Sequence, residues 1–157
     1  MLLANMTQRR AVGSSASGTA IQPGASREGE STLRISVIGT GYLGATHAAC
    51  LAHMGHHVLG VDVDSNKVAR LQSGELPFYE PELDALVREH LSDGSLRFSE
   101  SFDEAAKFAD VHFLAVGTPQ STSGPGADLA FIRAAVDALA PHLDRPALIA
   151  GKSTVPV

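Results

Sequence analysis

The stretch that decides the fold is Leu33-Arg34-Ile35-Ser36-Val37-Ile38-Gly39-Thr40-Gly41-Tyr42-Leu43-Gly44. Its first half is a short apolar run rich in β-branched residues, which is typical of a buried strand. Three glycines follow with the spacing Gly-x-Gly-x-x-Gly, and small, helix-compatible residues continue to Gly55. The pattern predicts a strand, a tight turn and a helix, in that order.

Apolar runs of strand length recur along the chain and alternate with segments of helical periodicity. They lie at 58–61, 96–98, 111–116 and 147–150. This alternation predicts an α/β fold with a Rossmann-type, doubly wound parallel sheet. We expect residues 1–32, which are rich in Ser, Ala and Gly, to be a disordered tail. We expect residues 33–157 to form one domain, incomplete because such folds continue with another helix and strand.

Composition narrows the classes of partner. The 157 residues are 44% apolar and 18% charged with a net charge of −5, which argues against a nucleic-acid or membrane surface. An anionic ligand is still compatible, because backbone N–H groups can bind phosphate. No apolar run reaches the ~20 residues of a membrane helix. The single cysteine, Cys50, permits no intrachain disulfide, and we expect a buried thiol in a cytoplasmic protein.

Each glycine of the turn has a predicted physical role. Gly39 allows the tight turn, Gly41 lets a diphosphate approach the backbone, and Gly44 lets the helix pack against the strand. The start of the helix offers free N–H groups and the positive end of the helix dipole. The turn therefore predicts a dinucleotide site.

An acidic residue, Asp62, ends the second predicted strand. We expect its carboxylate to accept hydrogen bonds from a ribose and to repel a 2′-phosphate, which favours NAD over NADP. Lys67 has two interpretations. Its side chain either contacts the cofactor, at the same ribose edge or at a phosphate, or is a solvated charge on the helix surface. The alternative for the whole constellation is a Rossmann fold that has lost nucleotide binding or binds another nucleotide.

Two further polar clusters follow predicted strands. Val116-Gly117-Thr118-Pro119 ends a central strand and Lys152-Ser153-Thr154 follows the last one, at the edge where ligands bind in open α/β sheets. Ser153 or Thr154 could hydrogen-bond a nicotinamide or a catalytic water. Ordinary turns and caps are the alternative. We expect no metal site, because Gly55 interrupts the histidines at 53, 56 and 57.

Taken together, these motifs resemble the N-terminal NAD-binding domain of the UDP-glucose/GDP-mannose dehydrogenase family. The resemblance also rests on Pro77-Phe78-Tyr79-Glu80-Pro81, whose tyrosine favours the UDP-glucose branch, and on Ala127-Asp128-Leu129. It implies oxidation of a sugar C6 hydroxyl to a carboxylate in two hydride transfers to NAD. It implies that Thr154 helps to hold a catalytic water. The implied cofactor contacts are Gly39, Thr40, Gly41, Tyr42, Leu43, Gly44, Asp62, Lys67, Val116, Gly117, Thr118, Pro119, Ser153 and Thr154.

The resemblance also implies what this sequence lacks. The family's catalytic cysteine, UDP-sugar domain and dimer-forming central helix lie in later sequence that has no counterpart here. We therefore expect NAD binding without turnover, a UDP-sugar only if the missing domain completes the site, and no family homodimer through that helix. The alternatives are a standalone nucleotide-binding or regulatory module, another nucleotide-sugar dehydrogenase such as a GDP-mannose dehydrogenase, or a fragment that does not fold stably.

Overall fold

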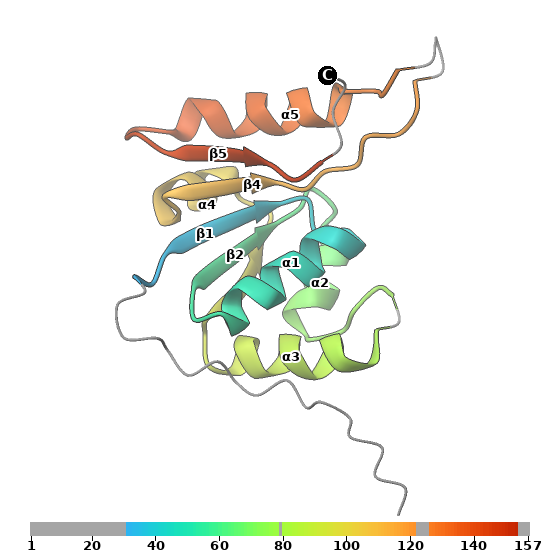
Figure 1. Ribbon diagram of the computed structural model, residues 1–157, viewed down its shortest axis with the longest axis vertical. Coiled ribbons are helices and arrows are strands. Elements are labelled where there is room, and N and C mark those ends of the chain that lie inside the picture. Colours follow the sequence, from blue (N-terminus) through green and yellow to red (C-terminus); the bar gives the residue numbers. More distant parts are fainter. Residues whose placement is uncertain (1–30, 79, 122–125, 154–157) are drawn as a thin grey trace, which may run out of the picture.

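The computed structural model describes residues 31–78, 80–121 and 126–153. Five parallel strands form one sheet in the order β3-β2-β1-β4-β5 (Figure 1). They are β1 Arg34–Ile38, β2 His57–Val61, β3 Leu96–Ser99, β4 Val111–Leu114 and β5 Leu148–Gly151. The chain reverses its direction of winding between β1 and β4, which is the topological switch point of a doubly wound sheet. The predicted Rossmann-type fold is confirmed.

Helices cover both faces of the sheet. They are α1 Tyr42–His53, α2 Ser65–Gln72, α3 Pro81–Ser92, α4 Phe102–Phe108 and α5 Ala130–Leu139, followed by a 3-10 turn, Ala140–His142. One core joins the sheet to α1, α2 and α3, and a second joins it to α4 and α5 (Figure 1). None of the helices in the described residues is long and apolar enough to cross a membrane.

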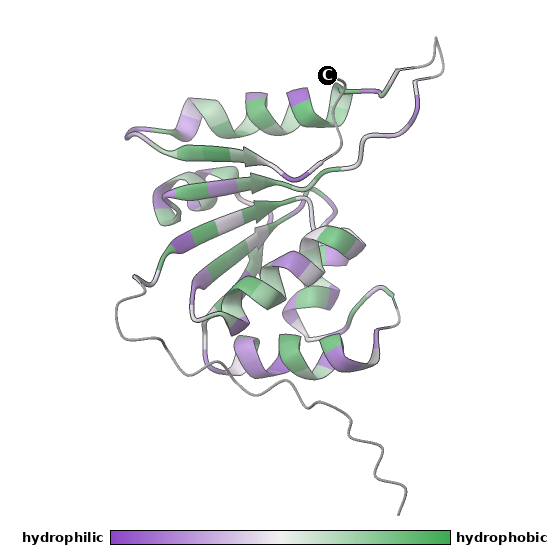
Figure 2. Ribbon diagram, in the orientation of Figure 1, coloured by the Kyte–Doolittle hydropathy of each residue, from purple (hydrophilic) through white to green (hydrophobic). Residues whose placement is uncertain are grey.

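The cores are built from apolar strands and small helix residues (Figure 2). Helix α1 buries Ala45, Ala48, Ala49 and Ala52, so that its backbone lies close to the sheet. Cys50 points away from this alanine face and is exposed. The prediction of a buried thiol is therefore wrong, because the alanines take the side that faces the strands. Strand β5, although apolar, leaves Leu148 62% exposed.

One predicted boundary differs from the structure. Strand β4 ends at Leu114, two residues before the end of the apolar run 111–116, and Ala115 and Val116 turn toward the switch point, where they line a cavity. Helix α5 begins at Ala130 with Leu129 as its N-cap. Asp128, one residue earlier, accepts a hydrogen bond from the Ala130 N–H at 2.9 Å. Asp64 caps α2, because its side chain accepts hydrogen bonds from the N–H groups of Asn66 and Lys67.

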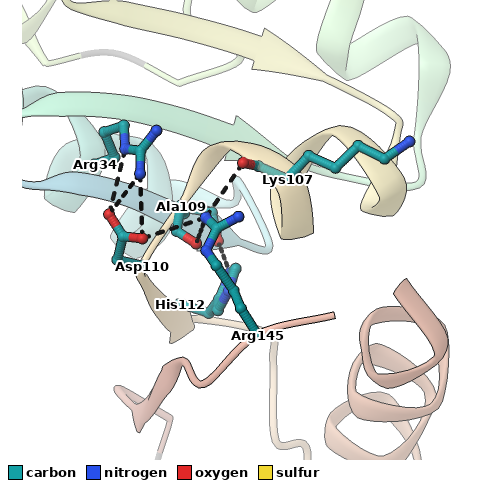
Figure 3. A network of polar contacts seen from close by, with 7 residues as sticks. Arg34, Lys107, Ala109, Asp110, His112 and Arg145 are labelled. Atoms are coloured by element: carbon teal, nitrogen blue, oxygen red, sulfur yellow. Dashed lines mark hydrogen bonds and ion pairs between the residues drawn. The ribbon is translucent and has the colours of Figure 1, made fainter. Parts of the chain in front are cut away.

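A polar network closes the amino ends of β1 and β4 (Figure 3). The Asp110 carboxylate pairs with Arg34 at 3.1 Å and with Arg145 at 3.2 Å. Arg145 also donates hydrogen bonds to the carbonyl oxygens of Lys107 and Ala109. The segment before β5 is thereby tied to the end of α4.

Just inside this network lies a buried polar pair. Ser36 of β1 and His112 of β4 are fully buried, and Ser36 Oγ lies 2.7 Å from His112 Nδ1. His112 Nε2 has no hydrogen-bond partner among the described residues. Burial, aided by the positive charge of Arg145, lowers the pKa of His112. The imidazole of the folded chain is therefore neutral at pH 7.

This pair predicts acid sensitivity. A histidine whose pKa is lowered by folding takes up its proton more readily in the unfolded chain, near pH 6.5, so stability falls as the pH drops below that value. We expect the Tm to decrease between pH 7 and pH 5, and the decrease to be shallower in the double variant Ser36→Ala, His112→Val. Thermal denaturation over a pH series measures this. Equal slopes for the two proteins would show that the pair is not the origin.

Candidate dinucleotide site

The turn that joins β1 to α1 lies at the carboxyl edge of the sheet, beside the switch point. Gly39 has a φ of +93°, a conformation that L side chains rarely adopt. A Cβ there would also lie 2.9 Å from the Val116 backbone nitrogen. The Gly39 N–H donates to the Val61 carbonyl oxygen at 2.7 Å, so the turn is held between β2 and the segment that follows β4.

The other two glycines of the turn have opposite surroundings. A Cβ on Gly44 would lie 1.8 Å from the Gly39 carbonyl oxygen, whereas a Cβ on Gly41 would meet nothing within 4 Å. Gly41 is also the N-cap of α1, and no side chain caps this helix. The first N–H groups of a helix have no partner within the helix. Open space beside an uncapped helix start is the arrangement that binds anionic groups.

Asp62 connects the turn to the end of β2. It is only 8% exposed. Its Oδ2 accepts hydrogen bonds from the Thr40 N–H at 2.8 Å, the Thr40 hydroxyl at 3.1 Å and Lys67 Nζ at 2.8 Å. Its Oδ1 accepts one hydrogen bond, from the Asp64 N–H at 3.1 Å. A carboxylate oxygen has about two accepting sites, so Oδ1 is the oxygen with capacity for a ligand hydroxyl.

The charge of Asp62 is secured by these contacts. Burial acts to raise its pKa, but the hydrogen bonds from Lys67, Thr40 and Asp64 outweigh it and the pKa lies below its ordinary value. Lys67, for which the sequence left two interpretations, forms an ion pair with Asp62. Its ammonium group is thus held beside this carboxylate, and its expected contact with a ribose or a phosphate stays a prediction.

A cavity of about 390 Å³ opens at this edge. It is bounded by the turn and the residues after β2 and β4 on one side and by apolar residues of α4 and α5 on the other. Four of the latter, Phe102, Phe131, Ala134 and Ala138, were not identified from the sequence. Their helical spacing is equally typical of core residues, and only the structure shows Phe131 to be 55% exposed at the cavity wall.

Only some of the remaining predicted residues line the cavity. Val116 and Gly117 line the cavity, and Gly117 has open space where a Cβ would lie. Ser153 Oγ lies 2.6 Å from the Val116 carbonyl oxygen, so this hydroxyl ties the end of β5 to the segment after β4, and its predicted contact with the cofactor stays a prediction. Four other predicted residues do not line the cavity. They are Thr118 and Pro119, which come after Gly117, and Tyr42 and Leu43 at the start of α1. Thr154 lies outside the described residues.

One histidine at the end of α1, His53, takes part in helix packing. His53 Nδ1 lies 3.4 Å from Nε2 of His90, which is buried near the end of α3. No group of three or more His, Cys, Asp or Glu residues within 31–78, 80–121 and 126–153 could hold a metal ion.

A parallel sheet with this strand order, a glycine turn at the switch point, an acid after β2 and a cavity between them define a dinucleotide-binding domain. Residues 33–157 match the family model described as "UDP-glucose/GDP-mannose dehydrogenase family, NAD binding domain". The chain belongs to this family, and the cofactor of the matched domain is NAD.

Individual relatives agree with this assignment. The chain is 41% identical over 125 residues to UDP-glucose 6-dehydrogenase YwqF of Bacillus subtilis, covering 80% of this chain and 28% of that protein. It is 44% identical over 92 residues to GDP-mannose 6-dehydrogenase of Pseudomonas putida, covering 59% and 21%. A UDP-glucose dehydrogenase structure from Pyrobaculum islandicum superposes with a TM-score of 0.78 at 40% identity, covering 85% and 31%. The chain thus spans less than a third of the length of these relatives.

The contrast between the glycines gives a direct test of the turn. We expect Gly44→Ala to lower the free energy of unfolding by about 1–3 kcal/mol or more, because the new methyl group overlaps the Gly39 carbonyl. We expect Gly41→Ala to change it by less than about 1 kcal/mol, since the methyl group enters open space. Urea denaturation of the two variants measures both values. Equal losses would contradict the geometry of the turn.

Proposed function

We propose that this chain binds NAD at the 39–44 turn and the adjoining cavity, as the cofactor-binding part of a UDP-glucose 6-dehydrogenase. The observation that carries the proposal is the open space at Gly41 beside the uncapped start of α1. A diphosphate fits there because the glycine has no side chain to block it and the helix start supplies N–H donors and a positive dipole end.

The rest of the site suits the two ends of NAD. The apolar wall formed by Phe102 and Phe131 favours an adenine ring, and Asp62 Oδ1 favours a ribose hydroxyl. Gly117 and Thr118 lie at the carboxyl end of β4, where the nicotinamide end would be expected. We assign Pro119, Ser153 and Thr154 to that end, with Thr154 as the residue that holds a water.

When bound, NAD supplies an acceptor for the hydride that leaves the sugar carbon. The residues of this chain bind and orient the cofactor. The relatives that act on UDP-glucose support this substrate, and the GDP-mannose enzyme is the alternative. Binding of a UDP-sugar, assembly of the family homodimer and a cytoplasmic location remain predictions for the whole protein.

The chain by itself is expected to bind NAD without turnover. Oxidation at the aldehyde level needs a covalent nucleophile. The only cysteine, Cys50, is exposed on α1 and is absent from the residues that line the cavity. Incubation of the purified chain with UDP-glucose and NAD should therefore give no UDP-glucuronate. Formation of UDP-glucuronate by this chain, detected by chromatography alongside the NADH absorbance at 340 nm, would overturn the expectation.

Asp62 should set the preference for NAD over NADP. Its negative charge lies beside the expected ribose and neutralises Lys67, so a 2′-phosphate meets repulsion and no free cation. We expect Asp62→Asn to weaken NAD binding and to narrow the ratio of the NAD and NADP affinities by about ten-fold, since Lys67 is then released.

Calorimetric titration with each dinucleotide measures the two affinities. Asp84→Asn, which removes a half-exposed carboxylate from α3, is the matched control and should leave the ratio unchanged. If wild type binds both dinucleotides equally, Asp62 has no selective role.

A further inference from the structure

Tyr42, the first residue of α1, makes a contact that the phosphate turn does not itself require. Its ring is 56% exposed and packs edge-to-face against Phe78, with the ring centroids 4.9 Å apart. Its hydroxyl donates a hydrogen bond to Glu80 Oε2 at 3.0 Å. The start of the phosphate-binding helix is thus joined to the segment that enters α3.

This contact links two helices that run side by side in the same direction. Tyr42 and Glu80 lie at the beginnings of α1 and α3, and His53 and His90 meet near their ends. Figure 1 shows α3 beside α1 along the same face of the sheet. Helix α3 is anchored in the core by Leu83 and Val87, which are buried. Glu80 therefore stands at the beginning of a helix with a fixed position.

The side chain of Glu80 accepts a hydrogen bond from Tyr42 and does not cap its own helix. Glu80 is the N-cap of α3, yet its carboxylate makes no capping hydrogen bond to that helix. The hydrogen bond and the negative charge of Glu80 together raise the pKa of the Tyr42 hydroxyl, so this donor keeps its proton at neutral pH.

The first turn of α1 needs such support. Its N-cap, Gly41, has no side chain to cap the helix, and glycine is the residue with the greatest backbone freedom. The hydrogen bond from the Ala45 N–H to the Gly41 carbonyl oxygen, 2.9 Å long, is a local restraint within the turn. A long-range contact through Tyr42 restricts the turn further and lowers the entropy lost when a ligand binds there.

We propose that Glu80 is a positioning residue of the dinucleotide site: through the Tyr42 hydroxyl it holds the first turn of α1 in the geometry that receives the diphosphate. The expected effect on affinity rests on the proposed function, whereas the effect on the turn itself does not. Glu80 acts through its hydrogen bond and contributes no favourable charge, because a carboxylate near an anion site repels the ligand.

Four variants separate the hydrogen bond from the charge. Tyr42→Phe removes the donor and keeps the ring, Glu80→Ala removes the acceptor, and Glu80→Gln keeps an acceptor without the charge. Glu82→Ala, an exposed acid in the first turn of the same helix, is the control. Amide hydrogen exchange of Ala45 without ligand reports on the turn, and calorimetric titration with NAD reports on the site.

We expect Tyr42→Phe and Glu80→Ala each to speed exchange at Ala45 and to raise the Kd for NAD by about two- to ten-fold, with an unchanged midpoint of global unfolding. Glu80→Gln and Glu82→Ala should exchange the Ala45 amide hydrogen at the wild-type rate. Neither variant should have a higher Kd for NAD than wild type. The proposal is overturned if Tyr42→Phe leaves exchange at Ala45 unchanged, or if Glu80→Gln behaves as Glu80→Ala. If wild type does not bind NAD, the proposed function fails. The exchange rates at Ala45 then decide whether Glu80 positions the turn.

Discussion

The structure depends on one close approach, between the start of α1 and the end of β1. With no Cβ on Gly44, the helix backbone can lie against the Gly39 carbonyl oxygen, where a methyl group would be only 1.8 Å away. This contact brings the uncapped start of α1 over the switch point between β1 and β4. The alanine face of α1 extends the same close packing along the sheet. The place and direction of the anion site therefore follow from packing as much as from ligand recognition.

Asp62 adds a second constraint with a double role. Its Oδ2 fixes Thr40 inside the turn and pairs with Lys67, while Oδ1 keeps an accepting site. The same carboxylate thus shapes the turn and remains available to a ribose. The hydrogen-bond donors around Asp62 stabilise its buried negative charge, whereas a buried charge without partners would destabilise the folded state. This explains how a residue at a ligand site can also be part of the framework.

Much of the fold was predictable from local patterns, because apolar runs, glycine spacing and helical periodicity are carried by neighbouring residues. The sheet, the family and NAD as the cofactor are confirmed. Features that depend on register were not predictable: Ser36 and His112 meet only because β1 and β4 pair as they do. Phe102 and Phe131 could not be told from core residues, and the ion pair of Lys67 with Asp62 was not anticipated. Cys50 was misplaced because an alanine-rich helix does not reveal which side faces the sheet.

The proposed binding mode places the diphosphate of NAD in the open space at Gly41. The most direct measurement is a thermal-shift titration with NAD of wild type and Gly41→Ala, whose unliganded stabilities should nearly agree. A ligand that binds only the folded state raises the Tm with its concentration. We expect a saturable rise for wild type and little or none for Gly41→Ala at the same NAD concentrations. Equal rises for the two proteins, or no rise for wild type at millimolar NAD, would overturn the assignment of the diphosphate to this turn.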